Sequence, residues 1–219
     1  MLDGPRIEPQ SGAAARQLVV FLHGVGADGA DLIEIGRQWG AALPDAAFVA
    51  PNAPDRSDWD PTRYQWFRLA ARDAHDYWQG AAAAAPLLDA FLDAELARLS
   101  LGDADLALVG FSQGTMMALQ VAPRRAHPPA AIIGYSGRIA GIARLARETV
   151  SRAPVLLVHG VEDEVIPVAA MDETANALRA AGFYVETLKR PGLGHGIDMA
   201  GLRAGAAFLQ RAFAQRSAE

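Results

Sequence analysis

The sequence predicts an α/β fold in which helices cover both faces of a mostly parallel β-sheet. Short apolar segments alternate along the 219 residues with longer segments of helical periodicity, which is the pattern of such folds. Residues of the AVILMFWYC set make up 51% of the chain, enough for a full core without covalent staples. At this length we expect residues 1–219 to form a single domain with no separate lid domain.

The predicted strands are short and apolar. Most are continuous runs rather than alternations of apolar and polar residues, which is typical of strands buried on both faces. The segments are Leu18–Leu22, Ala46–Ala50, Leu106–Val109, Ala131–Ile133, Val155–Val158 and the alternating Phe183–Leu188.

Helices are predicted between the strands from apolar residues at helical spacing. The stripes are Leu32, Ile35 and Trp39; Leu88, Leu92, Leu96 and Leu99; Val168, Met171, Ala175 and Leu178 after Pro167; and Leu202, Phe208, Leu209 and Phe213 within residues 199–213. Proline lacks a backbone N–H, so we expect the second helix to start late or to kink at Pro86.

Composition excludes several classes of function. Twenty basic and 25 acidic residues give a net charge of −5, which argues against nucleic acid as a partner. The chain has no cysteine, so disulfides, cysteinyl metal sites and a thiol nucleophile are excluded. No apolar run has the roughly 18–20 residues of a membrane span, and the N-terminus carries none at all. We therefore expect a cytoplasmic protein without membrane insertion.

The strongest local motif is Gly110–Gly114, which reads GFSQG and matches G-x-S-x-G. It follows a predicted strand and precedes the helical pattern Thr115–Val121, which is the context of a nucleophile elbow. Such a turn forces the serine into a strained conformation, leaves room only for glycine two residues away, and lifts the hydroxyl to the positive end of a helix. The motif predicts Ser112 as a nucleophile.

A serine hydroxyl needs a general base, and the chain offers five histidines. His195 lies in a glycine-rich loop between the last strand and the last helix, where it can reach across the strand ends, so it is the predicted base. His127 is predicted in a surface turn. His159 ends a strand, where we expect it to make structural hydrogen bonds.

The acid that orients the histidine is expected between these two residues in the chain. The loop after Val155–Val158 carries three adjacent carboxylates, Glu162, Asp163 and Glu164. Neighbouring side chains on an extended loop point in different directions, so we expect one of them to face the base. Spacing alone leaves open which one.

The first strong strand ends in His23–Gly26, which reads HGVG. Such a loop can aim a backbone N–H at the oxyanion that develops during acyl transfer, and the N–H of Gln113, which follows the serine, would be the second donor. No H-x-x-x-H or H-E-x-x-H spacing occurs, and no glycine-rich phosphate-binding motif either. The sequence thus predicts neither a metal nor another cofactor.

These segments resemble one known family. FLHGVGADGADL, GFSQGTMMAL, HGVEDEVIP and GLGHGID, in this order, are similar to the carboxylesterase, lysophospholipase and acyl-protein thioesterase family of α/β-hydrolases, over about 17–213. The resemblance implies that Asp163 is the triad acid and that Val25 and Gln113 supply the oxyanion donors. It also implies that Trp66 and Phe67 line the acyl pocket.

Where the family has aspartate after this aromatic pair, the chain has Arg68, which leaves the substrate open. The surrounding segment 51–78 shows neither the helical nor the strand periodicity of apolar residues, and it holds six aromatic residues. Within it, we expect residues 59–78 to cover the site.

The family resemblance implies a serine carboxylesterase that works through an acyl-enzyme intermediate, acting on a small-molecule or lipid-like acyl ester. Two alternatives stay open. One is an acyl-protein thioesterase or lysophospholipase acting on longer acyl chains, and the other is a non-catalytic binding module on the same fold. Members of the family often form homodimers, but the sequence displays no interface of that kind.

Overall fold

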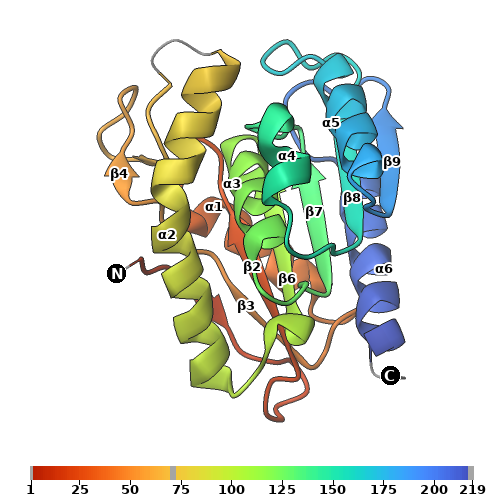
Figure 1. Ribbon diagram of the computed structural model, residues 1–219. Helices are drawn as coiled ribbons and strands as arrows, with labels where there is room; N and C mark the ends of the chain where they lie inside the picture. Colours follow the sequence, from red (N-terminus) through yellow and green to blue (C-terminus); the bar gives the residue numbers. More distant parts are fainter. Residues whose placement is uncertain (1, 70–72, 217–219) are drawn as a thin grey trace.

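The computed structural model describes residues 2–69 and 73–216. Within them a seven-stranded sheet runs in the order β1-β3-β2-β6-β7-β8-β9, in which β1 alone pairs antiparallel (Figure 1). The predicted α/β class with a mostly parallel sheet is confirmed. The carboxyl ends of the parallel strands meet at one edge, so the loops that follow them are brought together there.

The elements have the following bounds. The strands of the main sheet are β1 Arg6–Ile7, β2 Gln17–Leu22, β3 Ala46–Val49, β6 Leu106–Phe111, β7 Ala131–Tyr135, β8 Val155–Gly160 and β9 Val185–Arg190. A second sheet pairs β4 Asp55–Arg56 with β5 Tyr64–Gln65. The helices are α1 Gly29–Trp39, α2 Ala74–Leu99, α3 Gln113–Val121, α4 Ile142–Glu148, α5 Ala169–Ala180 and α6 Met199–Arg216.

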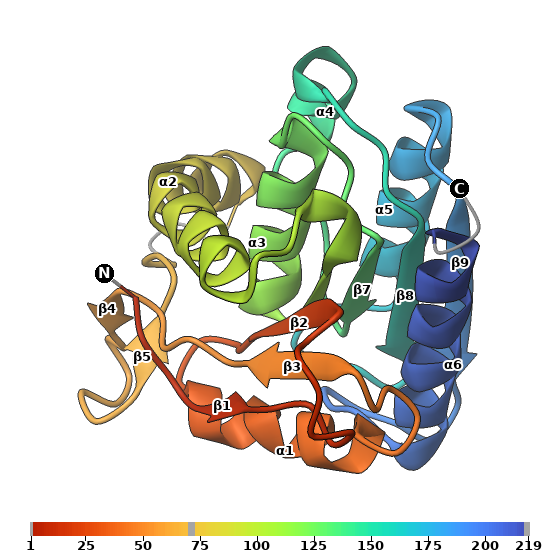
Figure 2. The same cartoon turned by 90° about the horizontal axis from the view of Figure 1, so that it is seen from below.

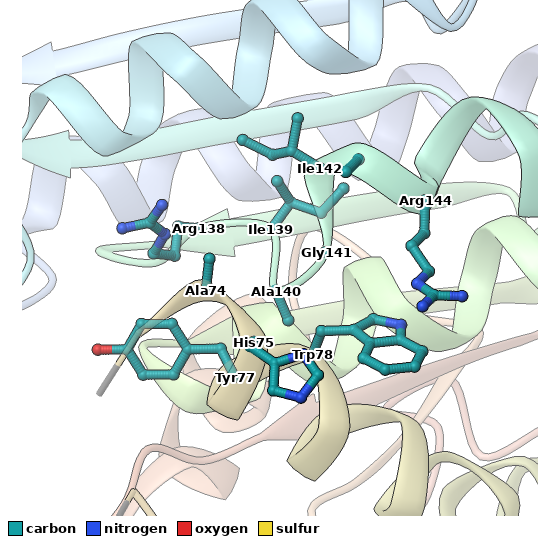
Figure 3. Close-up of a pocket in the computed structure, with 11 residues that line it drawn as sticks. Ala74, His75, Tyr77, Trp78, Arg138, Ile139, Ala140, Gly141, Ile142 and Arg144 are labelled. Atoms are coloured by element: carbon teal, nitrogen blue, oxygen red, sulfur yellow. The ribbon is translucent and has the colours of Figure 1, made fainter. Parts of the chain in front are cut away.

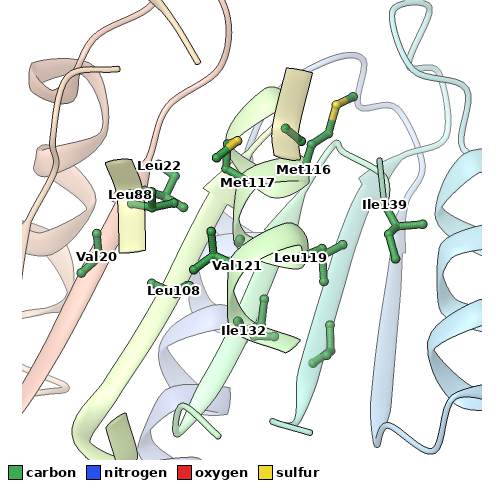
Figure 4. Packing of buried hydrophobic residues seen from close by; sticks show 14 of the residues in the cluster. Val20, Leu22, Leu88, Leu108, Met116, Met117, Leu119, Val121, Ile132 and Ile139 are labelled. Carbon is green, nitrogen blue, oxygen red and sulfur yellow. The ribbon is translucent and has the colours of Figure 1, made fainter. Parts of the chain in front are cut away.

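Helices cover both faces of the sheet, and no lid domain stands apart from these layers within the described residues (Figure 2). On one face α2, α3, α4 and α5 share a core with Val20 and Leu108, whose cluster around α3 is drawn in Figure 4. On the other face α1 and α6 pack against their strand neighbours Val19 and Val109. Successive residues of one strand enter opposite cores, which explains the continuous apolar runs in the sequence.

The expectation of a late helix start at Pro86 is wrong. α2 begins at Ala74, inside the segment predicted to be irregular, and continues through Pro86 to Leu99. Asp73 caps its first turn by accepting from the backbone N–H groups of His75 and Asp76. Pro86 faces solvent, where water can satisfy the carbonyl that the missing N–H leaves unpaired.

Other elements went unpredicted because their sequences are short or lack a clear period. These are the edge strand β1, the seven-residue helix α4 and the β4–β5 hairpin. The last strand lies two residues later than predicted, at Val185–Arg190. No helix among the described residues is both long and apolar enough to cross a bilayer.

Candidate active site

Ser112 lies at the junction of β6 and α3, at the carboxyl edge of the sheet. Its backbone has φ 54° and ψ −115°, a conformation that non-glycine residues rarely adopt. A Cβ on Gly110 would lie 2.4 Å from the Gly114 backbone, and one on Gly114 would lie 1.8 Å from the Leu22 carbonyl oxygen. The sharp turn predicted from G-x-S-x-G is therefore present, and the glycines are required by close backbone contacts.

A chain of hydrogen bonds joins the three residues predicted as a triad. His195 Nε2 lies 3.0 Å from Ser112 Oγ, and His195 Nδ1 lies 2.8 Å from Asp163 Oδ2. Glu162 and Glu164 on either side of Asp163 are exposed. The loop thus presents one of its three carboxylates to the histidine, and the tertiary arrangement selects Asp163.

Asp163 is held on both carboxylate oxygens. Oδ1 accepts the backbone N–H groups of Val165 and Ile166, each at 2.9 Å, while Oδ2 faces His195. Burial opposes the charge, but the hydrogen bonds from His195, Ile166 and Val165 outweigh it and keep the pKa of Asp163 below its ordinary value. The carboxylate is therefore ionised at neutral pH.

A second histidine contacts the same carboxylate. Buried His159, the strand-end residue predicted to be structural, places Nε2 2.8 Å from the Ile166 carbonyl oxygen and 3.1 Å from Asp163 Oδ2. It ties the end of β8 to the loop that carries Asp163. Its Nδ1 is buried without a hydrogen-bond partner among the described residues, so the proton belongs on Nε2, where it has an acceptor.

The loops after β8 and β9 pack backbone against backbone, which sets the position of His195. A Cβ on Gly160 would lie 2.2 Å from the Leu193 carbonyl oxygen, and the same oxygen accepts the Glu162 N–H at 3.0 Å. Ser136 Oγ donates to the Gly196 carbonyl at 3.1 Å. Sequence reasoning missed Gly160 and Ser136, since no local pattern indicates contacts across loops.

The two predicted oxyanion donors come from neighbouring loops. Val25 follows β2, Gln113 opens α3, and β2 pairs with β6 through Leu22 and Gly110. Neither the Val25 nor the Gln113 backbone N–H donates a hydrogen bond within the described part of the chain. Both groups are therefore available to a ligand oxygen beside Ser112.

The predicted covering segment, 59–78, divides into parts of different character, and its residues 70–72 lie outside the described residues. Trp66 and Phe67, predicted to bind substrate, are buried with 1% and 4% of their surface exposed. Arg68 points outward, with 77% of its side chain exposed, and pairs with Asp58 at 3.3 Å. Trp59 is exposed and lies 3.8 Å from the position of a Cβ on Gly26.

A cavity of about 390 Å³ opens between the start of α2 and the segment that leads into α4 (Figure 3). Tyr77 and Trp78 form one wall, and the Arg144 guanidinium lies 3.8 Å from the centroid of the Trp78 ring. The opposite wall begins at Arg138, directly after Gly137, where a Cβ would lie 2.8 Å from the Ser112 carbonyl oxygen. The cavity has the size of a small-molecule site, and its lining includes neither Ser112 nor His195.

His127 is exposed in the turn before β7, as predicted, and takes no part in the site. Among the residues that the structure describes, no group of three histidine or carboxylate side chains is placed to hold a metal ion.

The sequence profile of one family, described as phospholipase/carboxylesterase, matches residues 3–213. The chain belongs to the phospholipase/carboxylesterase family. The resemblance stated from the motifs is confirmed, and family membership makes the protein a hydrolase on the α/β-hydrolase fold.

Two curated relatives have names that indicate ester or thioester chemistry. The chain is 31% identical to Esterase YpfH of Escherichia coli (strain K12) over 185 residues, or 84% of this chain and 78% of that protein. It is 27% identical to Acyl-protein thioesterase 1 of Schizosaccharomyces pombe (strain 972 / ATCC 24843), over 79% of this chain and 80% of that protein.

Two solved structures have the same fold. The crystal structure of esterase PE8 is 43% identical and superposes with a TM-score of 0.93, covering 96% of this chain and 99% of that chain. The crystal structure of Arabidopsis thaliana SOBER1, at 22% identity, a TM-score of 0.77 and coverage of 90% and 99%, supports the fold alone.

Proposed function

We propose that this phospholipase/carboxylesterase family member is a serine carboxylesterase that hydrolyses acyl esters through an acyl-enzyme intermediate. The observation that carries the proposal is the hydrogen-bonded series from Ser112 through His195 to Asp163, with distances of 3.0 and 2.8 Å. A nucleophile, a base within reach of it, and an acid that orients the base are the parts that such catalysis requires.

The proposed reaction has two steps. His195 takes the proton of Ser112 as the hydroxyl oxygen attacks the ester carbonyl carbon, and Asp163 stabilises the imidazolium that forms. The N–H groups of Val25 and Gln113 donate to the oxyanion of the tetrahedral intermediate. The alcohol leaves with the proton from His195. Water, deprotonated by the same imidazole, then cleaves the acyl-serine ester and releases the acid.

Ser112→Ala tests this mechanism. The variant should lose nearly all hydrolysis of p-nitrophenyl acetate, since it has no nucleophile, while its circular dichroism and melting temperature stay close to those of the wild type. Ser100→Ala, which removes an exposed hydroxyl at the end of α2, is the matched control. Turnover by Ser112→Ala at the wild-type rate would exclude Ser112 as the nucleophile.

For the substrate we propose a small-molecule or lipid-like ester whose acyl or alcohol part enters the cavity between α2 and α4. The cavity of about 390 Å³ has room for a chain of intermediate length, and its walls combine aromatic with aliphatic side chains. The roles of Trp66 and Phe67 in substrate binding stay predictions. Rates across p-nitrophenyl esters of two to sixteen carbons measure the preferred length.

A thioesterase or lysophospholipase acting on longer chains is the second candidate, and the thioesterase named among the relatives favours it. A rate that keeps rising to sixteen carbons, or a preference for a thioester over the matched ester, would replace the first proposal by this one.

A non-catalytic binding module on the same fold would leave Ser112 unlabelled by a fluorophosphonate. We further propose a single domain over residues 1–219, location in the cytoplasm, and no cofactor; a homodimer remains a prediction for size measurements in solution.

A further inference from the structure

We propose that four residues, Tyr64–Phe67, act as a bridge that holds the two oxyanion donors at a fixed separation, with the Trp66 indole and the Gln113 amide as positioning groups. This inference rests on the proposed function, because it assumes that the N–H groups of Val25 and Gln113 bind the oxyanion. Val25 lies on the loop after β2 and Gln113 lies at the start of α3, after β6. The pairing of β2 with β6 does not reach these residues, so further contacts must set the distance between the two N–H groups.

The first part of the bridge pairs with the loop that carries Val25. The Gly26 N–H donates to the Tyr64 carbonyl at 2.9 Å, and the Tyr64 N–H donates to the Ala27 carbonyl at 3.0 Å. These bonds form an isolated antiparallel pair between Ala27 and Tyr64, the first residue of β5. The backbone immediately after Val25 is thereby fixed to the start of the bridge.

The Trp66 indole fixes the backbone immediately before Val25. Its Nε1–H donates to the His23 carbonyl at 3.0 Å, and the two rings lie 5.7 Å apart. The His23 ring in turn bonds the Gly24 carbonyl through Nδ1 at 2.7 Å and accepts the Ala53 N–H at Nε2 at 3.0 Å. The Gly24 carbonyl and the Val25 N–H belong to one planar peptide unit, so holding the carbonyl sets the direction of the N–H.

The end of the bridge is held by the side chain of the other donor residue. The Trp66 backbone N–H donates to Gln113 Oε1 at 2.8 Å, and Gln113 Nε2 donates to the Phe67 carbonyl at 2.8 Å. Glutamine supplies one acceptor and one donor at the spacing that this backbone presents, which neither glutamate nor a hydrocarbon side chain can do.

The contacts of Trp66, Gln113 and His23 are shielded from water. Trp66 and Gln113 each have 1% of their surface exposed, and His23 has none. Hydrogen bonds in such surroundings are strong, and a partner left alone is costly. A loosened bridge would displace a donor from the point where negative charge develops. Such displacement weakens binding of the transition state more than binding of the ester.

Two variants remove the positioning groups and leave both backbone donors in the chain. Trp66→Phe keeps an aromatic ring but removes the indole N–H, and Gln113→Met keeps the length of the side chain but removes both amide hydrogen bonds. Each has a matched control on a residue outside the site. Trp39→Phe removes an indole N–H that donates to the Leu202 carbonyl at 3.1 Å on the other face of the sheet. Gln120→Met changes a second buried glutamine, at the far end of α3.

We expect kcat for p-nitrophenyl acetate to fall about ten- to a hundredfold in Trp66→Phe and Gln113→Met, with KM within about twofold of the wild type. The affinity for a trifluoromethyl ketone, whose adduct with serine carries an oxyanion, should fall by the same factor as kcat/KM. The double variant should lose less than the product of the two single losses, because both act through one bridge. Trp39→Phe should lower the melting temperature because it removes a buried hydrogen bond, and kcat should stay within about twofold of the wild type in both Trp39→Phe and Gln120→Met.

A fall in kcat with unchanged KM and matched loss of ketone affinity supports the bridge. A wild-type kcat in folded Trp66→Phe and folded Gln113→Met overturns it. If only one of the two variants folds, that variant decides. Stoichiometric labelling of wild-type Ser112 by a fluorophosphonate separates this result from the proposed function. Absence of labelling overturns that function and the bridge together, whereas labelled variants with wild-type kcat overturn the bridge alone.

Discussion

Replacing Asp163 by asparagine reverses the hydrogen-bond pattern of the site while the shape of the side chain stays almost the same. In the wild type one carboxylate oxygen accepts the N–H groups of Val165 and Ile166 at 2.9 Å, and the other faces His195 Nδ1 at 2.8 Å. Asparagine has a single oxygen, and the two backbone donors hold it. Its NH₂ group then points at His195 Nδ1 and at His159 Nε2. In the wild type, His159 Nε2 lies 3.1 Å from Asp163 Oδ2.

Facing an NH₂ group, His195 Nδ1 must act as an acceptor, so the proton of the neutral ring moves to Nε2. A protonated Nε2 cannot take the proton of Ser112, although it still lies near the 3.0 Å hydrogen-bond distance. The comparable change in a serine protease triad lowers kcat about 10⁴-fold. We therefore expect a loss of about 10³- to 10⁴-fold in kcat for Asp163→Asn, or roughly 4–5.5 kcal/mol of transition-state stabilisation.

The assay is steady-state hydrolysis of p-nitrophenyl acetate at pH 7.5, with KM expected to change little because the ester is not held by the triad. Glu164→Gln makes the same chemical change at the adjacent exposed residue and should leave kcat unchanged. A folded Asp163→Asn enzyme with kcat within tenfold of the wild type would refute the assignment of Asp163, and an equal loss in Glu164→Gln would refute the selection of one carboxylate.

Two further predictions concern stability. Burial holds the pKa of His23 in the folded protein below its ordinary value. At pH values between this lowered pKa and the unfolded-state pKa of about 6.5, the unfolded chain therefore binds more protons than the folded one. The free energy of unfolding, from urea titrations, should therefore fall as the pH drops below about 6.5, by up to about 1.4 kcal/mol per pH unit for this group. The lowered pKa of Asp163 adds a further loss only below about pH 4. His23→Asn should flatten the decline near pH 6 whereas His127→Asn, at an exposed residue, should not; equal slopes in both variants would contradict this account. Arg125, with 7% of its side chain exposed, pairs with three carboxylates, of which that of Asp103 is itself largely buried. Arg125→Met should therefore cost about 3 kcal/mol in urea unfolding with kcat unchanged, and a cost below about 1 kcal/mol would show that solvent screens these pairs.

The parts of the fold that sequence reasoning predicted correctly depend on local patterns. The predicted strands Leu106–Val109 and Val155–Val158 lie within β6 and β8. A short continuous apolar run is what a strand buried on both faces of a sheet requires, so the pattern could be recognised locally. The elbow at Ser112 is also local, since two glycines and a strand-to-helix change define it within five residues. The start of α2 escaped prediction because Pro86 disfavours a helix unless its face is open to solvent, and exposure is a property of the folded chain.

The sequence alone determined that this protein is an α/β-hydrolase, and it identified the residue types that can carry out acyl transfer. The apolar strand segments, the nucleophile elbow and the order of the loops are all recognisable from short local sequence patterns. Spacing alone left open which carboxylate among 162–164 faces His195; the family resemblance implied Asp163, and the tertiary structure shows that side chain facing His195. It alone brought His159 onto Asp163 and joined Gln113 to Trp66, residues 47 apart in the chain. Hydrogen bonds between distant loops depend on how the strands place those loops, and no local spacing records that placement.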